Sequence, residues 1–249
     1  MKVFTIANQK GGVGKTSFAT HFAFYMIEKG MKGVFIDLDT QINASYTLGK
    51  AFPTKQHAHM LFSETPEIEL SDTGLTLLAG SNELAEIYNN TSVNEVAMKF
   101  YNSINLLKNK DLDFCIIDTA PSLNSSLVAA LVASDYVICP IEPEKYALQG
   151  ISKMINLIAN VKKQNTKLEF LGILISKINR RSPRHIKHNN ELLENYPDAV
   201  LPQSIGLRDS IAEAVDIGVP VWNIKKTAAR AASKEIKSVI EHILSKVNK

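Results

Sequence analysis

Short runs of Val, Ile, Leu and Phe alternate with longer helical patterns along the chain, and this alternation restricts the fold more than any other feature of the sequence. The runs are apolar at consecutive positions rather than at every second one. This is typical of strands that helices cover on both faces. We therefore expect an α/β fold, with a doubly wound and mostly parallel sheet between two layers of helices. In such sheets, ligands bind beyond the carboxyl ends of the strands.

The expected elements follow from the positions of these runs and of the residues between them. We expect strands at residues 3–7, 33–39, 75–80, 113–120, 136–141, 170–176 and 199–202. We expect helices at residues 17–29, 43–49, 83–108 and 228–247, and others between the later strands. Residues 50–74 show neither pattern and are predicted to form a surface excursion. Because no repeat or low-complexity linker divides residues 1–249, we expect a single domain.

Composition is that of an ordinary globular protein, with 45% hydrophobic and 21% charged residues. No apolar run approaches the ~18–20 residues that a membrane-spanning helix needs, and the first residues lack the pattern of a secretion signal. Cys115 and Cys139 each lie inside an apolar run, which predicts buried and reduced thiols. We therefore expect a cytoplasmic protein.

The charges are distributed unevenly, although the net charge is only +3. Residues 1–150 hold 11 Lys, no Arg and 16 Asp or Glu, whereas residues 151–249 hold 12 Lys, all five Arg and 9 Asp or Glu. An excess of basic residues in one part of a chain is compatible with a polyanionic partner, and equally with a merely solvated surface. Residues 177–249 are therefore a candidate surface for binding a polyanion such as DNA.

A glycine-rich loop lies between the first predicted strand and the first predicted helix, where residues 9–17 read Gln-Lys-Gly-Gly-Val-Gly-Lys-Thr-Ser. Glycines let successive backbone N–H groups turn toward phosphate oxygens, a lysine meets the phosphate charge, and a Ser or Thr hydroxyl binds Mg²⁺. A glycine turn without a ligand is the plainer alternative, but the strand–loop–helix context favours a nucleotide. The candidate nucleotide-binding residues are Gly11, Gly12, Val13, Gly14, Lys15, Thr16 and Ser17.

Three aspartates end predicted strands that should lie near this loop. Asp37 and Asp39 follow the second strand, and Asp118 ends the run Phe-Cys-Ile-Ile. A carboxylate at this position can hold Mg²⁺ through water, because Mg²⁺ retains much of its hydration. Each of them could instead cap a helix or a turn, and Asp37 could serve only to brace the loop.

The sequence KGGVGKT resembles the deviant Walker A motif of the ParA/MinD/Soj family of ATPases, because Lys10 precedes the glycines and the usual first glycine is replaced by Gln9. The resemblance extends along the chain through FIDLDTQINAS, FCIIDTAPS, PIEPEKYALQGISKMI, GILISKIN and LPQSIGLRDSIAEAVDIGVPV. It is strongest to ParA-type partition ATPases of the short form, which lack an N-terminal DNA-binding domain. Thr40 and Ala120 depart from the family pattern, which frequently has proline at these positions.

The resemblance implies a role for each candidate in binding and hydrolysing ATP with Mg²⁺. Lys10 would reach the nucleotide of a second copy and join Lys15 in catalysis, so that ATP binding produces a homodimer. Thr16 would bind the metal directly, with Asp37 and Asp118 in its outer shell. Asp39 would orient the attacking water. Asn179 is a candidate neighbour of the adenine, although an asparagine that ends a strand in a turn is the plainer interpretation.

The same resemblance implies nonspecific binding of double-stranded DNA by the ATP-bound dimer, since phosphate contacts need only Lys and Arg on one face. The candidate contacts are Arg180, Arg181, Arg184, Arg208, Lys226 and Arg230. No aromatic residues interleave with these positions, which argues against stacking on single strands. The implied function is segregation of plasmid or chromosome DNA by a slow ATPase that a ParB-like centromere-binding protein stimulates. Such a protein would associate with the nucleoid.

Two other interpretations concern relatives with different partners. A MinD-like ATPase that cycles on membranes would need an amphipathic membrane-binding helix, and the last predicted helix ends in SKVNK without a bulky aromatic on its apolar face. Packing of this helix on the sheet is the plainer interpretation. A relative of the nitrogenase iron protein would need cysteine thiolates as cluster ligands. Cys115 and Cys139 lie within strands and do not fit that role.

Overall fold

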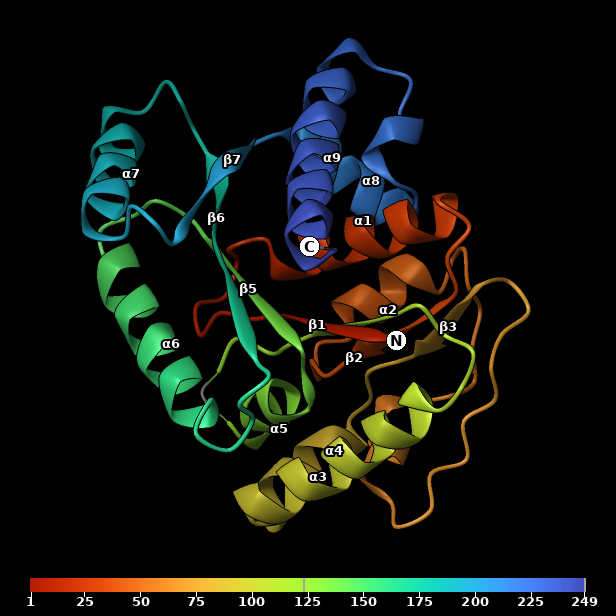
Figure 1. Ribbon diagram of the computed structural model, residues 1–249. Helices are drawn as coiled ribbons and strands as arrows, with labels where there is room; N and C mark the ends of the chain where they lie inside the picture. Colours follow the sequence, from red (N-terminus) through yellow and green to blue (C-terminus); the bar gives the residue numbers. More distant parts are fainter. Residues whose placement is uncertain (123, 249) are drawn as a thin grey trace.

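The computed structural model describes residues 1–122 and 124–248, and within these residues it contains a seven-stranded sheet in which every pairing is parallel (Figure 1). The strands are β1 (Lys2–Ile6), β2 (Gly33–Asp37), β3 (Leu75–Leu78), β4 (Phe114–Asp118), β5 (Tyr136–Ile141), β6 (Glu169–Ile178) and β7 (Val200–Gly206). Their order across the sheet is β3-β2-β4-β1-β5-β6-β7. The predicted α/β fold is confirmed.

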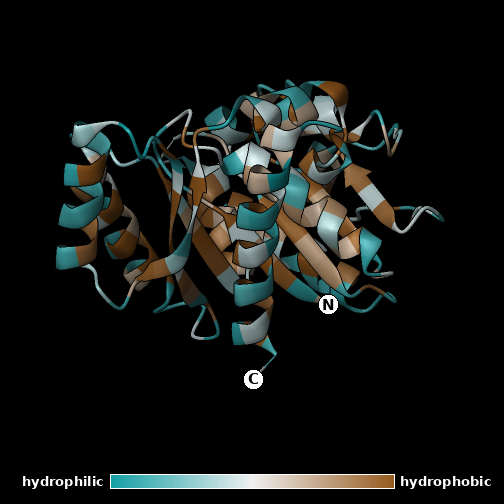
Figure 2. Ribbon diagram, turned by 90° about the horizontal axis from the view of Figure 1, so that it is seen from above, coloured by the Kyte–Doolittle hydropathy of each residue, from teal (hydrophilic) through white to brown (hydrophobic). Residues whose placement is uncertain are grey.

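Helices cover both faces of the sheet. They are α1 (Lys15–Glu28), α2 (Asn43–Leu48), α3 (Glu83–Asn90), α4 (Val93–Lys108), α5 (Ser125–Ala133), α6 (Ala147–Val161), α7 (Pro183–Asn195), α8 (Asp209–Ile217) and α9 (Thr227–Val247), with 3₁₀ turns η1 (Ala58–Phe62) and η2 (Val221–Asn223). Helices α1, α2, α8 and α9 share one apolar core with the sheet, and α3 to α7 form the cores on the other face (Figure 1). Figure 2 shows the hydrophobic strands at the centre and hydrophilic residues on the outer helices.

Alternate residues of each central strand enter opposite cores. On β4, Phe114 and Ile116 join the core that contains α1, whereas Cys115 and Ile117 join the core that contains α4. Each buried side chain of this size stabilises the fold by about 1.5–3 kcal/mol. Both cysteines are fully buried, as predicted, and burial raises the pKa of both thiols, that of Cys139 to about 12. Neither thiol is therefore suited to ligate an iron–sulfur cluster.

The single helix predicted over residues 83–108 is wrong, because two helices, α3 and α4, occupy this region. The break lies at Thr91 and Ser92, which have extended backbones, and the Ser92 hydroxyl accepts a hydrogen bond from the backbone N–H of Glu95 (3.3 Å). Serine followed three residues later by glutamate is a helix-start signal. The apolar periodicity continues across the break and conceals it.

The prediction that residues 50–74 form only a surface excursion is also wrong, because part of this segment is buried in the core. The turn η1 buries Leu61 and Phe62 in the core beneath α4, and the Phe62 ring stacks on Phe100 with 5.3 Å between centroids. A 3₁₀ turn of five residues is too short to produce a recognisable period. The last strand is also longer than residues 199–202, since β7 continues to Gly206.

His21 connects α1 to the turn η2 inside the core. Its Nε2 accepts a hydrogen bond from the backbone N–H of Val221 (3.1 Å), so its Nδ1 carries the hydrogen and donates to the Ser17 carbonyl oxygen (2.6 Å). Burial lowers the pKa of His21 to about 4. The ring of Trp222 lies edge-on to the imidazole, with 5.7 Å between centroids.

Because the pKa of His21 is lower in the folded chain than its ordinary value of 6.5, the unfolded chain takes up a proton first as pH falls. We expect His21 to remove about 2 kcal/mol from the free energy of unfolding between pH 8 and pH 5. Denaturant titrations followed by Trp222 fluorescence measure this effect. A His21→Gln variant should show a correspondingly smaller loss. An equal pH dependence in parent and variant would contradict the assignment.

Candidate nucleotide-binding and ATPase site

The glycine-rich loop joins the carboxyl end of the central strand β1 to the start of α1. Gly12 and Gly14 have left-handed backbones, with φ of 76° and 89°, which glycine adopts without steric penalty. Asn8, 1% exposed, donates from its amide nitrogen to the Pro140 carbonyl oxygen (2.7 Å) and accepts from the backbone N–H of Lys10 (2.9 Å). The loop is thus anchored to β5 at the point where it leaves the sheet.

The two lysines of the loop point in different directions. Lys15 is 6% exposed, and its ammonium donates to the Lys10 carbonyl oxygen within the loop (3.2 Å). Burial lowers the pKa of Lys15, against the opposing charges of Asp118 and Asp39. The Lys10 side chain is 43% exposed and forms an ion pair with Glu144, which lowers the pKa of that carboxyl. Lys15 therefore serves the chain's own loop, whereas Lys10 extends outward.

Two of the predicted aspartates are neighbours in the sheet. Asp37 at the end of β2 is in register with Asp118 at the end of β4, and both are fully buried. The Thr16 hydroxyl donates to Asp118 Oδ2 (2.7 Å), and Ser45 donates to Asp37 Oδ2 from its backbone N–H (2.9 Å) and its hydroxyl (2.6 Å). The structure brings Lys15, Thr16 and both carboxylates together.

Burial dominates the electrostatics of these carboxyl groups. It raises the pKa of Asp37 to about 6 and, together with the charge of Asp37, raises the pKa of Asp118 to about 8. Hydrogen bonds from Ser45 oppose the shift at Asp37, and the Thr16 hydroxyl opposes it at Asp118. The two carboxylates repel each other in a medium of low dielectric constant, so a cation between them would favour their charged forms.

The residues present fit a magnesium ion. Asp118 Oδ1 is buried and has no hydrogen-bond partner within the described residues, while its other oxygen holds the Thr16 hydroxyl. Hydroxyl and carboxylate oxygens are the ligands that Mg²⁺ prefers, directly or through water. Thr16, Asp37 and Asp118 are the residues that would hold the ion, which when bound would neutralise phosphate charge.

Asp39 lies just beyond the two buried carboxylates. It is 7% exposed, and its Oδ1 accepts a hydrogen bond from the backbone N–H of Gln41 (2.9 Å). The turn continues to Ile42, which has a left-handed backbone with φ of 53°. Gly80 packs directly against this turn. A Cβ on Gly80 would lie only 2.6 Å from the Asp39 carbonyl oxygen, so a larger residue would not fit there. Asp39 is therefore held at the rim of the site.

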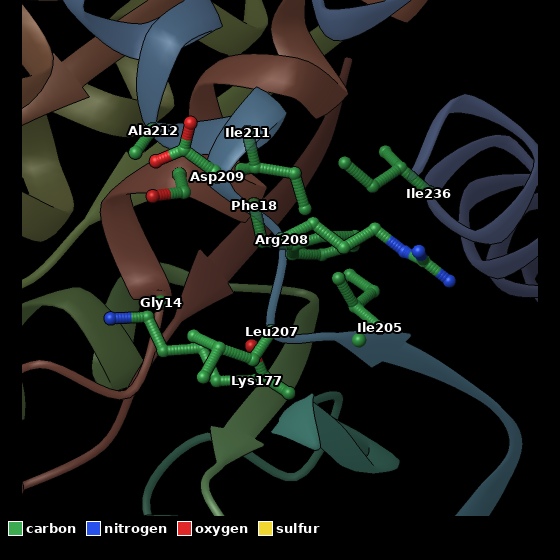
Figure 3. Close-up of a pocket in the computed structure, with 13 residues that line it drawn as sticks. Gly14, Phe18, Lys177, Ile205, Leu207, Arg208, Asp209, Ile211, Ala212 and Ile236 are labelled. Carbon is green, nitrogen blue, oxygen red and sulfur yellow. The ribbon is translucent and has the colours of Figure 1, made fainter. Parts of the chain in front are cut away.

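A cavity of about 350 Å³ opens beside the loop (Figure 3). Its walls come from the start of α1, the end of β6, the connection between β7 and α8, and α9. It is lined by Gly14, Ser17, Phe18, Ser176, Lys177, Ile205, Gly206, Leu207, Arg208, Asp209, Ile211, Ala212 and Ile236. Mostly apolar walls with a few polar groups are typical of a pocket for a planar ring, and this one is continuous with the phosphate loop.

Asn179 does not line this cavity. Its side-chain oxygen accepts from the backbone N–H of Arg181 (3.0 Å), and the residue borders a second cavity of about 410 Å³. Asn179 thus forms a turn, as its plainer interpretation predicted. Lys177, Leu207 and Asp209 were not identified from the sequence. The only sequence signal at these positions is that they lie in GILISKIN and LPQSIGLRDSIAEAVDIGVPV, two of the segments that resemble the family.

The predicted DNA contacts come from three segments of the chain: the turn after β6 with the start of α7, the connection between β7 and α8, and the start of α9. Arg180, Arg181 and Arg208 line the second cavity. Arg184 is exposed in the first turn of α7, whereas Lys226 and Arg230 are exposed at the start of α9.

Several of these cations already have partners. Arg208 forms hydrogen bonds with both carboxylate oxygens of Glu235 (2.9 and 2.6 Å), and Lys226 forms an ion pair with Glu213 (2.7 Å). Arg180 donates to the Ser204 hydroxyl (2.8 Å). Among the residues that the structure describes, Arg181, Arg184 and Arg230 form no ion pair.

Comparisons with known proteins identify the family to which the chain belongs. A family model described as an AAA domain matches residues 1–170. Protein IncC of Escherichia coli is 47% identical over 257 residues, which cover 99% of this chain and 70% of IncC. The sporulation initiation inhibitor protein Soj of Bacillus subtilis is 30% identical over 230 residues, covering 88% of this chain and 90% of Soj. A solved structure described as a plasmid partition protein of Borrelia burgdorferi bound to AMPPNP is 25% identical, covers 98% of this chain and 99% of that chain, and has a TM-score of 0.79.

The parallel sheet, the loop with two lysines and the carboxylates at the strand ends define a P-loop ATPase with a deviant Walker A motif. The chain belongs to the ParA/MinD/Soj family of these ATPases. The family resemblance predicted from the sequence is therefore confirmed. The roles of individual residues remain predictions.

Gly14 offers a direct test of the loop geometry. A Cβ at this position would lie 2.7 Å from Ser176 Oγ, and the left-handed backbone adds strain. We expect Gly14→Ala to lower the free energy of unfolding by about 2 kcal/mol and to abolish nucleotide binding. Denaturant titration and calorimetric ATP titration measure the two effects.

Gly150 provides the matched control for this substitution. It lies in α6, and a Cβ there would meet nothing within 4 Å. Gly150→Ala should raise the free energy of unfolding by up to about 1 kcal/mol and leave ATP binding unchanged. Normal ATP affinity in Gly14→Ala would show that the loop does not hold phosphate in the way described.

Proposed function

We propose that this chain is an ATP-dependent, dimerising ATPase that binds nonspecific double-stranded DNA and positions plasmid or chromosome DNA with a ParB-like partner. The carrying observation is the loop itself: Lys15 and the Thr16–Asp118 pair point inward, while Lys10 points outward. Support for the partition role comes from the chromosome partitioning protein ParA of Caulobacter vibrioides, which is 27% identical over 253 residues, and from the Borrelia plasmid partition protein bound to AMPPNP.

The proposed mechanism begins with ATP in the loop. Backbone N–H groups of the glycines and the dipole of α1 stabilise the phosphates, and Lys15 supplies the buried positive charge. Lys10 leaves Glu144 and contacts the nucleotide of the second copy, so two bound nucleotides close the dimer. Asp39 orients water for attack on the γ-phosphate. Hydrolysis removes the contact that holds the dimer together.

Exposed arginine side chains that form no ion pair within the described residues support DNA binding by the dimer. Arg181 and Arg184 are exposed, near each other in sequence and free of ion pairs within the described part of the chain. Arg208 forms an ion pair with Glu235, and Lys226 forms one with Glu213, so the charges of both cations are partly neutralised. We therefore assign the main phosphate contacts to Arg181 and Arg184. Two copies would present this weak surface twice and bind more tightly.

The membrane-cycling alternative receives less support. Within the described residues no helix is long and apolar enough to cross a bilayer. The apolar face of α9 is also already occupied. Ile236, Val239, Ile240 and Ile243 are buried in the core beneath it. Without unfolding from the sheet, α9 has no apolar stripe to insert into lipid.

Asp39 is tested by a substitution that keeps its turn. Asp39→Asn retains an oxygen that can accept from the Gln41 N–H but removes the charge. We expect ATP hydrolysis to fall about a hundredfold or more, because one catalytic group commonly contributes 10²–10⁴-fold. ATP binding should persist, and the variant should stay on DNA longer than the parent after ATP is chased. Asp72→Asn, in an exposed turn, is the control. Equal hydrolysis by parent and Asp39→Asn would refute the role of Asp39.

The DNA surface is tested with a double variant. Arg181→Ala combined with Arg184→Ala should weaken binding of random-sequence duplex DNA in the presence of ATP, Mg²⁺ and the second copy. The log–log salt dependence should become shallower by about two per chain, since each lost phosphate contact reduces the slope by about one. Mobility shifts at several salt concentrations measure this, with Lys55→Ala as an exposed control. DNA binding that is equal with ATP, ADP and no nucleotide would defeat the proposed switch.

A further inference from the structure

Lys177 lies in an irregular end of β6, beside the phosphate loop. Ile175 is in register with Ser204 of β7, and Ile178 is in register with Gly206, so three steps on β6 correspond to two on β7. This is a β-bulge, a feature that redirects side chains and is common next to active sites. Lys177 itself has a left-handed backbone, with φ of 54°.

The bulge places two consecutive side chains on one side of the strand. In a regular strand Ser176 and Lys177 would point to opposite faces. Here both line the cavity next to the loop, and both approach Gly14. A Cβ on Gly14 would lie 2.7 Å from Ser176 Oγ and 4.0 Å from Lys177 Cε. Figure 3 shows the Lys177 side chain extending alongside Gly14, with its nitrogen at the loop.

The left-handed backbone of Lys177 indicates that the lysine side chain has a specific role at this position. Glycine adopts a left-handed conformation without steric penalty and asparagine tolerates it, whereas lysine has no such advantage. Strain of this kind persists where the surrounding structure requires it, and it is concentrated at functional sites. Within the described residues, the Lys177 ammonium forms no hydrogen bond or ion pair with the protein. A partially buried cation at the mouth of a phosphate loop is suited to an anion.

We infer that Lys177 is a nucleotide-binding residue whose ammonium contacts the phosphates nearest the ribose. This inference rests on the proposed function, which places a nucleotide in the loop and its base in the cavity. Gly14 and Ser17 lie where the loop and the cavity meet, and Lys177 borders the same junction. Its charge therefore serves phosphates that ADP and ATP share. The other two cations of the loop are directed elsewhere: the Lys15 ammonium donates to the Lys10 carbonyl oxygen (3.2 Å), and Lys10 pairs with Glu144.

Calorimetric titration of ADP and of a non-hydrolysable ATP analogue tests the inference. Lys177→Met keeps most of the aliphatic stem and removes the charge, and Lys177→Gly also relieves the backbone strain. We expect both variants to bind ADP and the ATP analogue about tenfold more weakly, to a similar extent for each nucleotide. The loss should shrink at high salt, and Lys177→Gly should unfold at no lower denaturant concentration than the parent.

Two variants serve as controls for this experiment. Lys177→Arg should retain most of the affinity, because it keeps a cation on a long stem. Lys153→Met, an exposed lysine of α6, should bind as the parent does.

Three results with the variants would overturn the inference. Unchanged affinity for ADP in Lys177→Met would do so. A loss that does not depend on salt would assign Lys177 a packing role. A loss confined to the ATP analogue would place the ammonium at the γ-phosphate instead. Failure of the parent chain to bind either nucleotide would overturn the proposed function itself, and with it this inference.

Discussion

The structure depends on two carboxylates buried side by side at the carboxyl edge of a parallel sheet. Asp37 and Asp118 are fully buried neighbours in register, and burial raises the pKa of each. Two negative charges on neighbouring strands in a medium of low dielectric constant repel each other strongly unless hydrogen bonds and cations compensate them. Ser45, Thr16 and the glycine-rich loop are arranged around this pair. The loop brings Lys15, and Asp118 Oδ1, which has no hydrogen-bond partner in the part of the chain that the structure describes, is suited to a metal.

The same edge connects nucleotide binding to the surface. Ser45 links Asp37 to α2, because its hydroxyl donates to Asp37 and accepts from the Gly80 N–H (2.8 Å). Gly80 in turn packs against the Asp39 turn, whose last residue, Ile42, has a strained backbone. A change in the charge between the strands therefore has a direct path to an exposed turn. On the other side of the loop, the Lys10–Glu144 ion pair joins the loop to the segment that follows β5.

Much of this architecture follows from sequence patterns that act over short distances. Consecutive apolar residues predict covered strands, and the glycines with Lys15 and Thr16 predict the phosphate loop, since both signals are local. The break at Ser92 was missed because the apolar period continues through it, and Leu61 and Phe62 were missed because a 3₁₀ turn has no period. Lys177 could not be recognised, because its role depends on a bulge set by pairing with β7. Ion pairs such as Arg208–Glu235 join residues 27 positions apart and leave no local signal.

The central claim is that the buried carboxylates and the loop form a site for ATP together with Mg²⁺. The most direct measurement is the unfolding midpoint of the full chain with ATP, with and without Mg²⁺, and with EDTA. At ATP concentrations about a hundredfold above Kd, binding should stabilise the fold by ~2.7 kcal/mol, and most of this should require Mg²⁺. Such a rise in Tm, lost on adding EDTA, is the predicted result. An unchanged Tm, or equal stabilisation with EDTA present, would contradict the account.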